Sequence, residues 1–356
     1  MKRFLLLFLL LFLVSETGAS ALSLPAELKQ GADGEIVEIA ESADGLGIGG
    51  VWRVLERLLP DAGRTVKEGL KSVMLQVVIV LLAGIGENFY RSAGGSEAND
   101  PTPMAAVFAV TALTVRDMGG MMQSCTSLLT ELGAFADALL PTLAASVAAT
   151  GAVSAAATEQ VITAWVSSAM IRCLNGFLPS LVFAYIALSG ASASLGDERM
   201  KRFASALRKG IGWCLAAVVT VFSLYLSLTH ILAGSSDAVT LRVTKAAISS
   251  AVPVVGSIIS DTAETVLAGA GMMRNAIGVF GLLTVISLCA LPFLTLLIRY
   301  LAYRVAALAS IALEGGRLAD YMEEMSGAFS LMLGMIGSAA LMLFVSIFAS
   351  MAVMTG

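Results

Sequence analysis

The chain has 356 residues, of which 57% are hydrophobic and 13% are charged, and its formal net charge is −4. Soluble domains carry roughly 25% charged residues, so lipid must cover part of this protein, and the small net charge offers no basic field for nucleic acid. A single histidine and four scattered cysteines argue against a zinc site and a disulfide framework. Cys125, Cys173, Cys214 and Cys289 lie in or near apolar segments, so we expect each to pack as a small apolar side chain.

Residues 1–21 have the pattern of a secretory signal peptide. Lys2 and Arg3 form a charged start, 4–14 is an apolar run shorter than the roughly 20 residues of a membrane span, and 19–21 is a small-residue cleavage site. Cleavage would place the new N-terminus outside the cytoplasm. An uncleaved anchor is the alternative.

Residues 22–71 are the most polar part of the remaining chain, and they predict a small extracytoplasmic segment lying against the membrane surface. Its first half is acidic, and a glycine-rich break follows at 45–50. The pattern at 51–59 predicts a short amphipathic helix, which Pro60 is expected to end.

Residues 72–356 predict an all-α, polytopic membrane bundle of about six to eight spans. Small residues in the weaker spans suit close helix packing inside such a bundle. Close helix contacts are predicted at Gly278, Gly281, Gly334 and Ser338, with added flexibility as the alternative role of the glycines. The clear spans are 72–88, 210–233, 276–297 and 327–352, and the weaker, Ala-rich ones are 103–122, 132–151, 158–175 and 177–195.

The distribution of basic residues predicts an orientation. The strongest basic cluster in any joint lies between 195 and 210, which the positive-inside rule places in the cytoplasm. Arg299, Arg304 and Arg317 mark a second joint on the same side. The segment 237–275 is then on the outer side, or dips into the membrane from there.

This segment, 237–275, predicts two short amphipathic helices broken at Pro253 and Gly256. The first helix carries cations and the second carries anions. The hairpin is either interfacial with a wet polar face, or a re-entrant element that lines a conduit or docks a partner. The candidate contact residues are Arg242, Lys245, Pro253, Gly256, Asp261, Glu264 and Asn275.

Charged residues interrupt two of the weaker spans. Arg116 and Asp117 form an intramembrane polar pair if the span at 103–122 is real, and a surface pair if that span ends near Val115. Glu131 and Asp137 are expected at helix ends.

Enzyme chemistry finds no support in the sequence. The chain lacks the HExxH, GxSxG, Walker-type and CxxC motifs, and its loops are too short for a soluble catalytic domain. His230 is expected to cap a helix end at the membrane surface. We therefore predict no catalytic residue, no metal and no cofactor.

Several stretches give the chain a family resemblance. They are 138–151 (ALLPTLAASVAATG), 241–267 (LRVTKAAISSAVPVVGSIISDTAETVL) and the continuation at 275–278. With these stretches the sequence resembles the stage III sporulation protein AE family of endospore-forming bacteria. The resemblance implies a membrane component of an apparatus joining mother cell and forespore, whose outer side faces the forespore. It also implies partner subunits, including ring-forming proteins and a secretion-type ATPase.

Two classes of function follow. The protein is either a scaffold or channel core of a multiprotein complex, or a stand-alone permease that moves a small solute by alternating access. Matched broken helices in two halves would favour the permease. The sequence shows one such break, at 253–256, and no matching partner for it, so the assembly role leads.

Overall fold

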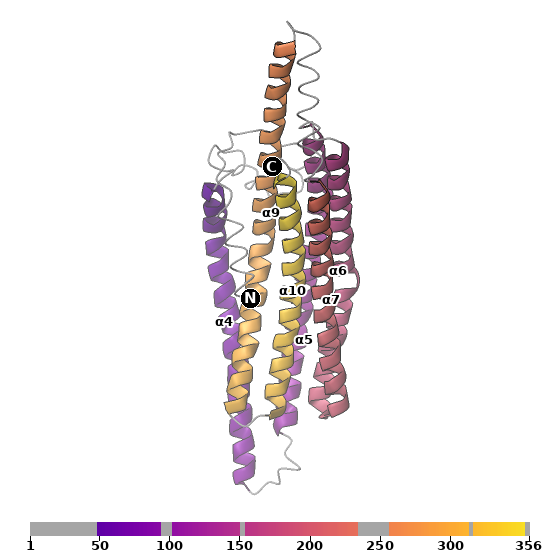
Figure 1. Cartoon of the computed structure of the whole chain (residues 1–356). Coiled ribbons are helices and arrows are strands. Elements are labelled where there is room, and N and C mark those ends of the chain that lie inside the picture. The colour runs from indigo at the N-terminus through magenta and orange to yellow at the C-terminus, as the bar shows by residue number, and fades with distance from the viewer. Residues whose placement is uncertain (1–47, 94–101, 150–153, 234–255, 313–315, 353–356) are drawn as a thin grey trace.

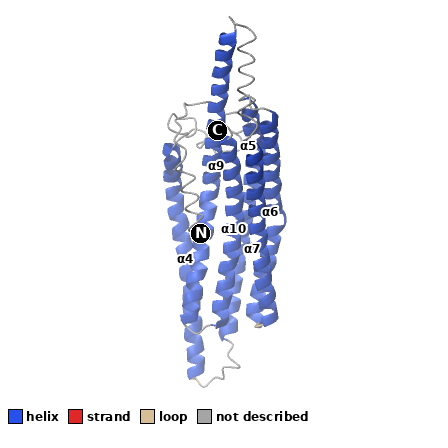
Figure 2. Cartoon of the chain, viewed as in Figure 1, coloured by secondary structure: helices blue, strands red, loops and turns tan. Residues whose placement is uncertain are grey.

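The computed structural model describes residues 48–93, 102–149, 154–233, 256–312 and 316–352. Every described element is a helix, which confirms the predicted all-α class (Figure 2). The predicted signal peptide lies outside the described residues. The helices are α4 (Ile48–Ser92), α5 (Thr102–Ala149), α6 (Ser154–Leu195), α7 (Glu198–Ala233), α9 (Gly256–Ala312) and α10 (Gly316–Ala352).

The helices run side by side as an elongated bundle (Figure 1). α10 contacts α9, α6, α5 and α7, and it carries the densest set of buried side chains. Aromatic rings join the helices: Tyr303 on α9 lies 5.2 Å from Phe329 on α10, and Phe135 on α5 lies 6.4 Å from Phe280 on α9. The core therefore sits around α10, which packs against four of its neighbours.

Five described helices contain segments long and apolar enough to cross a membrane. The predicted number of six to eight is not confirmed, and the predicted span at 72–88 lies in α4. The five candidate spans are Met118–Ala149, Val161–Leu195, Glu198–Leu226, Gly271–Ile311 and Leu318–Met351.

Two pairs of predicted neighbouring spans each form one continuous helix. The segments 103–122 and 132–151 belong to one helix, α5, and 158–175 and 177–195 belong to α6. Polar residues at the expected α5 joint do not interrupt the helix, since their hydroxyls bond carbonyls of the preceding turn. Thr126 Oγ1 donates to Met122 O at 2.6 Å, and Thr130 Oγ1 donates to Thr126 O at 2.8 Å.

Two other predicted helix boundaries are wrong. Pro60 lies inside α4 and does not end it. The second hairpin helix is not separate, because Gly256 begins α9, which continues without interruption through the predicted span 276–297. Proline inside a helix leaves one carbonyl without its usual donor, and neighbouring groups or local adjustment can compensate within a packed bundle.

The predicted close contacts at glycines are confirmed. A Cβ at Gly278 would lie 2.5 Å from Met351 Sδ, and one at Gly281 would lie 2.6 Å from Leu139 Cδ2. At Gly334 the nearest atom, Leu215 Cδ1, would be 3.1 Å away. The missing side chains therefore let α9 approach α5 and α10, and let α10 approach α7.

Gly281→Ala is expected to lower the free energy of unfolding relative to Gly212→Ala by about 1–3 kcal/mol. Both changes gain the intrinsic helix preference of alanine. Only the first adds a methyl group that meets Leu139 and Ile347, since nothing lies within 4 Å of a Cβ at Gly212. Unfolding midpoints of the two variants in lipid bicelles would measure the difference. Equal midpoints would show that the glycine is not needed for packing.

The cysteines meet the packing prediction only in part. Cys125 and Cys289 are buried, Cys214 is half-buried and Cys173 is exposed, and all four are free thiols.

Candidate functional site

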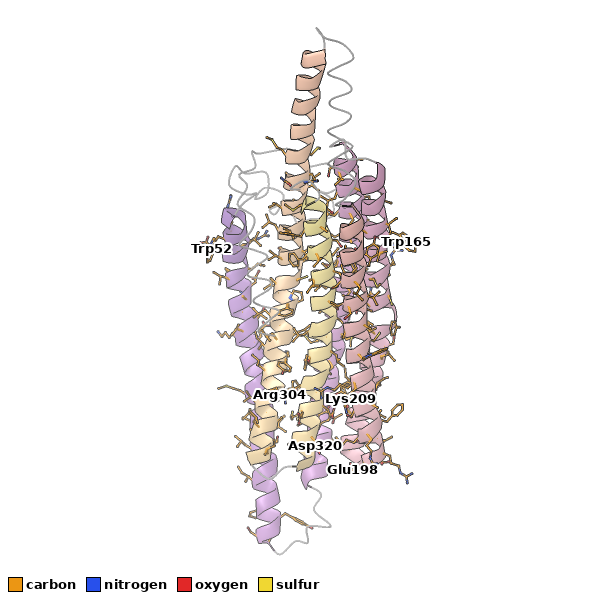
Figure 3. The ribbon with its side chains drawn as sticks, viewed as in Figure 1. Trp52, Trp165, Glu198, Lys209, Arg304 and Asp320 are labelled. Carbon is orange, nitrogen blue, oxygen red and sulfur yellow. The ribbon has the colours of Figure 1, made fainter. Side chains whose placement is uncertain are left out.

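One end of the bundle, which we call the charged end, holds ion pairs between helices. Lys201 on α7 binds Asp320 on α10 at 2.6 Å, and Arg304 on α9 binds Glu323 on α10 at 3.1 Å. Figure 3 shows Lys209, Arg304, Asp320 and Glu198 together at this end. The basic groups near 195–210 and near 299–304 therefore lie on one side, as the sequence predicted.

A tight joint positions these groups. Gly196 has a positive φ of 70°, and its amide donates to Ser192 O at 2.8 Å, which ends α6. Asp197 Oδ1 then accepts from the backbone amide of Arg199 at 2.8 Å, which caps the start of α7. The basic cluster consequently occupies the first turns of α7 instead of an open loop.

Deeper in the charged end, Glu324 joins three helices. Tyr185 on α6 donates to the Glu324 carboxylate and lies 2.7 Å from Glu324 O, while Arg208 Nη1 on α7 lies 3.9 Å from Glu324 Oε2. Gly327 leaves room for this arginine, because a Cβ there would lie 2.6 Å from Arg208 Cζ. An open pocket of about 200 Å³ adjoins the cluster and is lined by Ser189, Asp197, Lys201, Asp320 and Glu324, among others.

At the opposite end, Arg274 on α9 is buried and binds the end of α10. Its Nη2 donates to Met351 O at 2.7 Å. The last carbonyls of a helix lack intrahelical donors and carry partial negative charge, so a guanidinium there satisfies and stabilises them. Arg274 therefore joins α9 to the last turn of α10 at this end of the bundle.

The distance between these ends fits a membrane. Tyr185 contacts Glu324 at the charged end, and Trp165, which projects outward from α6, is an aromatic residue of the kind that lies at membrane interfaces (Figure 3). About twenty residues of helix separate them, or roughly 30 Å, the thickness of a hydrocarbon core. Asn175 lies halfway between them.

At this middle depth α5 and α6 share a cluster of polar side chains. Arg172 Nη2 binds Asp137 Oδ2 at 2.7 Å, and Ser168 Oγ donates to the other oxygen of the same carboxylate. Asn175 Nδ2 donates to Thr130 Oγ1 at 2.9 Å. A fourth contact, from Ser127 Oγ to Glu131 Oε1 at 3.1 Å, extends the cluster along α5.

The cluster faces outward instead of into the bundle. The Arg172 side chain is 72% exposed and the Asp137 side chain is 41% exposed. A hollow of about 350 Å³ lies over the pair, with Pro141 and Trp165 at its walls. Charged groups inside a membrane normally face the protein interior or water. The outward face of α5 and α6 is therefore the leading candidate functional site.

The sequence-predicted site residues lie elsewhere. Arg242, Lys245 and Pro253 fall outside the described residues. Asp261 and Glu264 belong to the first turns of α9, on the part that projects beyond the bundle (Figure 1). Gly256 begins that helix, and Asn275 is half-buried beside Arg274.

The other predicted pair, Arg116 and Asp117, lies inside α5.

The sequence analysis did not identify this site, because Glu131 and Asp137 were assigned to helix ends and Arg172 was assigned no role. Glu131 and Asp137 were expected at helix ends, but both lie well inside α5. Arg172 sits in an apolar stretch four residues after Ser168, and this spacing places both on one helix face. A search for opposite charges inside two Ala-rich segments could have found the pair.

Comparison with known proteins identifies the family. Residues 39–354 match the family model described as stage III sporulation protein AE. The chain is 25% identical over 276 residues to stage III sporulation protein AE of Bacillus subtilis (strain 168), covering 77% of this chain and 68% of that relative. No solved structure shows significant similarity. These matches confirm the resemblance seen in the sequence, and the chain belongs to the stage III sporulation protein AE family.

Proposed function

We propose that this protein is an integral membrane subunit of a sporulation-specific channel complex between mother cell and forespore, located in the mother-cell membrane around the forespore. The observation that carries the proposal is the Asp137–Arg172 pair at middle depth on the outward face of two spans. In a bundle surrounded only by lipid, an outward-facing charged pair at this depth would be unfavourable. In a subunit that contacts other proteins or water inside the membrane, those groups can solvate or pair with the charges.

Two further features support an assembly role over a stand-alone permease. The described helices are continuous, and the prolines Pro141, Pro179 and Pro292 lie inside them without a break. Alternating access commonly uses broken helices near the membrane centre, and the described parts of the chain show none. The family match is to a sporulation protein, which is consistent with a dedicated apparatus.

The projecting start of α9 supplies the second expected contact of this subunit. Asp261 and Glu264 are three residues apart and therefore lie on neighbouring positions of one helix face. Because this part of α9 extends beyond the bundle at the end opposite the charged end, it would reach partner subunits on the forespore side.

The double variant Asp261→Ala with Glu264→Ala is expected to reduce the yield of heat-resistant spores about tenfold, since about 1.4 kcal/mol of lost contact energy lowers occupancy by that factor. The matched control replaces Glu56 and Asp61, two exposed acidic residues on α4, with alanine. Both variants should reach normal levels in membranes. Spore yields equal to the control would remove the start of α9 from the proposed interface.

A further inference from the structure

The outward face of α5 differs from the exposed faces of the other spans. Large apolar side chains cover the exposed faces of α7 and α9, for example Trp213, Leu224 and Leu308. Along α5 from 120 to 149, every exposed residue is polar, small or proline. These residues are Gly120, Gln123, Ser124, Ser127, Thr130, Glu131, Ala134, Asp137, Pro141, Ala145, Ala148 and Ala149.

Lipid is a poor partner for such a face. The acyl chains of a bilayer pack well against large aliphatic side chains, and a charge at middle depth is unfavourable there. Small side chains instead allow another helix backbone to approach closely. Over about eight turns, α5 therefore offers the surface of a helix–helix interface that is exposed in the described bundle.

The charges on this face do not balance. Asp137 and Arg172 neutralise each other at 2.7 Å. Glu131 accepts a hydrogen bond from Ser127, and among the described residues no cation forms an ion pair with it. Within a membrane this carboxyl group is costly to ionise unless a cation lies beside it. A group of opposite charge at the same depth would remove the cost.

We propose that the outward face of α5 docks a transmembrane helix of another subunit, which presents a lysine or arginine to Glu131 and small residues to Ala134. The inference deepens the proposed function, on which it rests, by naming the surface and the chemistry of its partner. A second copy of this chain fits less well, because it would bring another uncompensated Glu131 to the same depth. The hollow beside Asp137 and Trp165 gives the partner helix a place for one larger side chain.

The test uses the full chain in membranes of sporulating cells. A photo-crosslinking amino acid replaces Ala134, and in the matched control it replaces Ala216, an exposed alanine on the apolar face of α7. We expect a cross-link from position 134, and not from 216, to a transmembrane segment of a different protein that contains a lysine or arginine. Mass spectrometry of the cross-linked peptides identifies that segment.

Charge reversal then tests the chemistry of the contact. Glu131→Lys is expected to lower the yield of the cross-link at 134 about tenfold, because it replaces an attraction with a repulsion. Changing the partner's basic residue to glutamate should restore the yield. Glu131→Gln should have a smaller effect than Glu131→Lys, since it removes the charge without reversing it.

Three results would overturn the proposal. They are cross-links from 134 only to another copy of this chain, cross-links only to lipid, and an unchanged yield with Glu131→Lys. If spore formation still requires the protein in that case, the docking surface is wrong while the proposed function stands. If deletion of the protein leaves spore formation intact, the proposed function itself fails.

Discussion

Asp137→Ala is expected to lower the free energy of unfolding of the purified protein in lipid bicelles by about 2.5–3.5 kcal/mol, the cost of an unpaired arginine near the membrane centre. The variant leaves Arg172 without its carboxylate, which now lies 2.7 Å away. Adding Arg172→Ala should recover most of the loss, because the double variant has neither charge. Reversible unfolding by detergent, followed by helical circular dichroism, gives the three values.

The size of the effect reports the environment of the pair. An exposed ion pair in water is worth about 0–1 kcal/mol, and the Arg172 side chain is 72% exposed in the isolated bundle. A loss below about 1 kcal/mol would therefore mean that water reaches the pair when the protein stands alone. A larger loss that the double variant repairs would place it in hydrocarbon.

The second large effect is expected at the charged end. Glu324→Ala removes the carboxylate that Tyr185 and Arg208 share, and this carboxylate is only 18% exposed. We expect a loss of about 1.5–3 kcal/mol, the range for a hydrogen bond to a charged group. The same unfolding assay measures it.

Tyr185→Phe is the matched control for this cluster. It keeps the ring, which is fully buried, and removes only the hydroxyl. Its loss should be smaller, about 1.5 kcal/mol, the low end of that range, since Arg208 keeps its carboxylate. Equal losses for both variants would show that the tyrosine hydroxyl, and not the ion pair, holds α6, α7 and α10 together at this end.

The sequence predicted what hydropathy and charge determine directly. The all-α class, the close contacts at Gly278 and Gly281 and the common side of the two basic joints follow from apolar runs, missing side chains and the distribution of arginine and lysine. Each of these features follows from the local composition of short segments of the chain. Because local composition is enough to predict these features, the structure agrees with them.

The candidate site could not be predicted in the same way, because it depends on two helices meeting. Asp137 and Arg172 are 35 residues apart, and each alone resembles a polar joint between short spans. The hydroxyls of Thr126 and Thr130 hide the continuity of α5, since they lower the hydropathy while bonding the helix backbone. Polar residues within an apolar segment therefore indicate a helix end only where a helix-breaking residue lies beside them.

The length of α9 has a mechanical consequence. Its 57 residues form one helix of about 85 Å, more than twice the thickness of a hydrocarbon core. Arg274 holds it to the end of α10, and Arg304 holds it to Glu323 at the charged end. A force on the projecting start of α9 would therefore act along one continuous helix that contacts α10 at both positions.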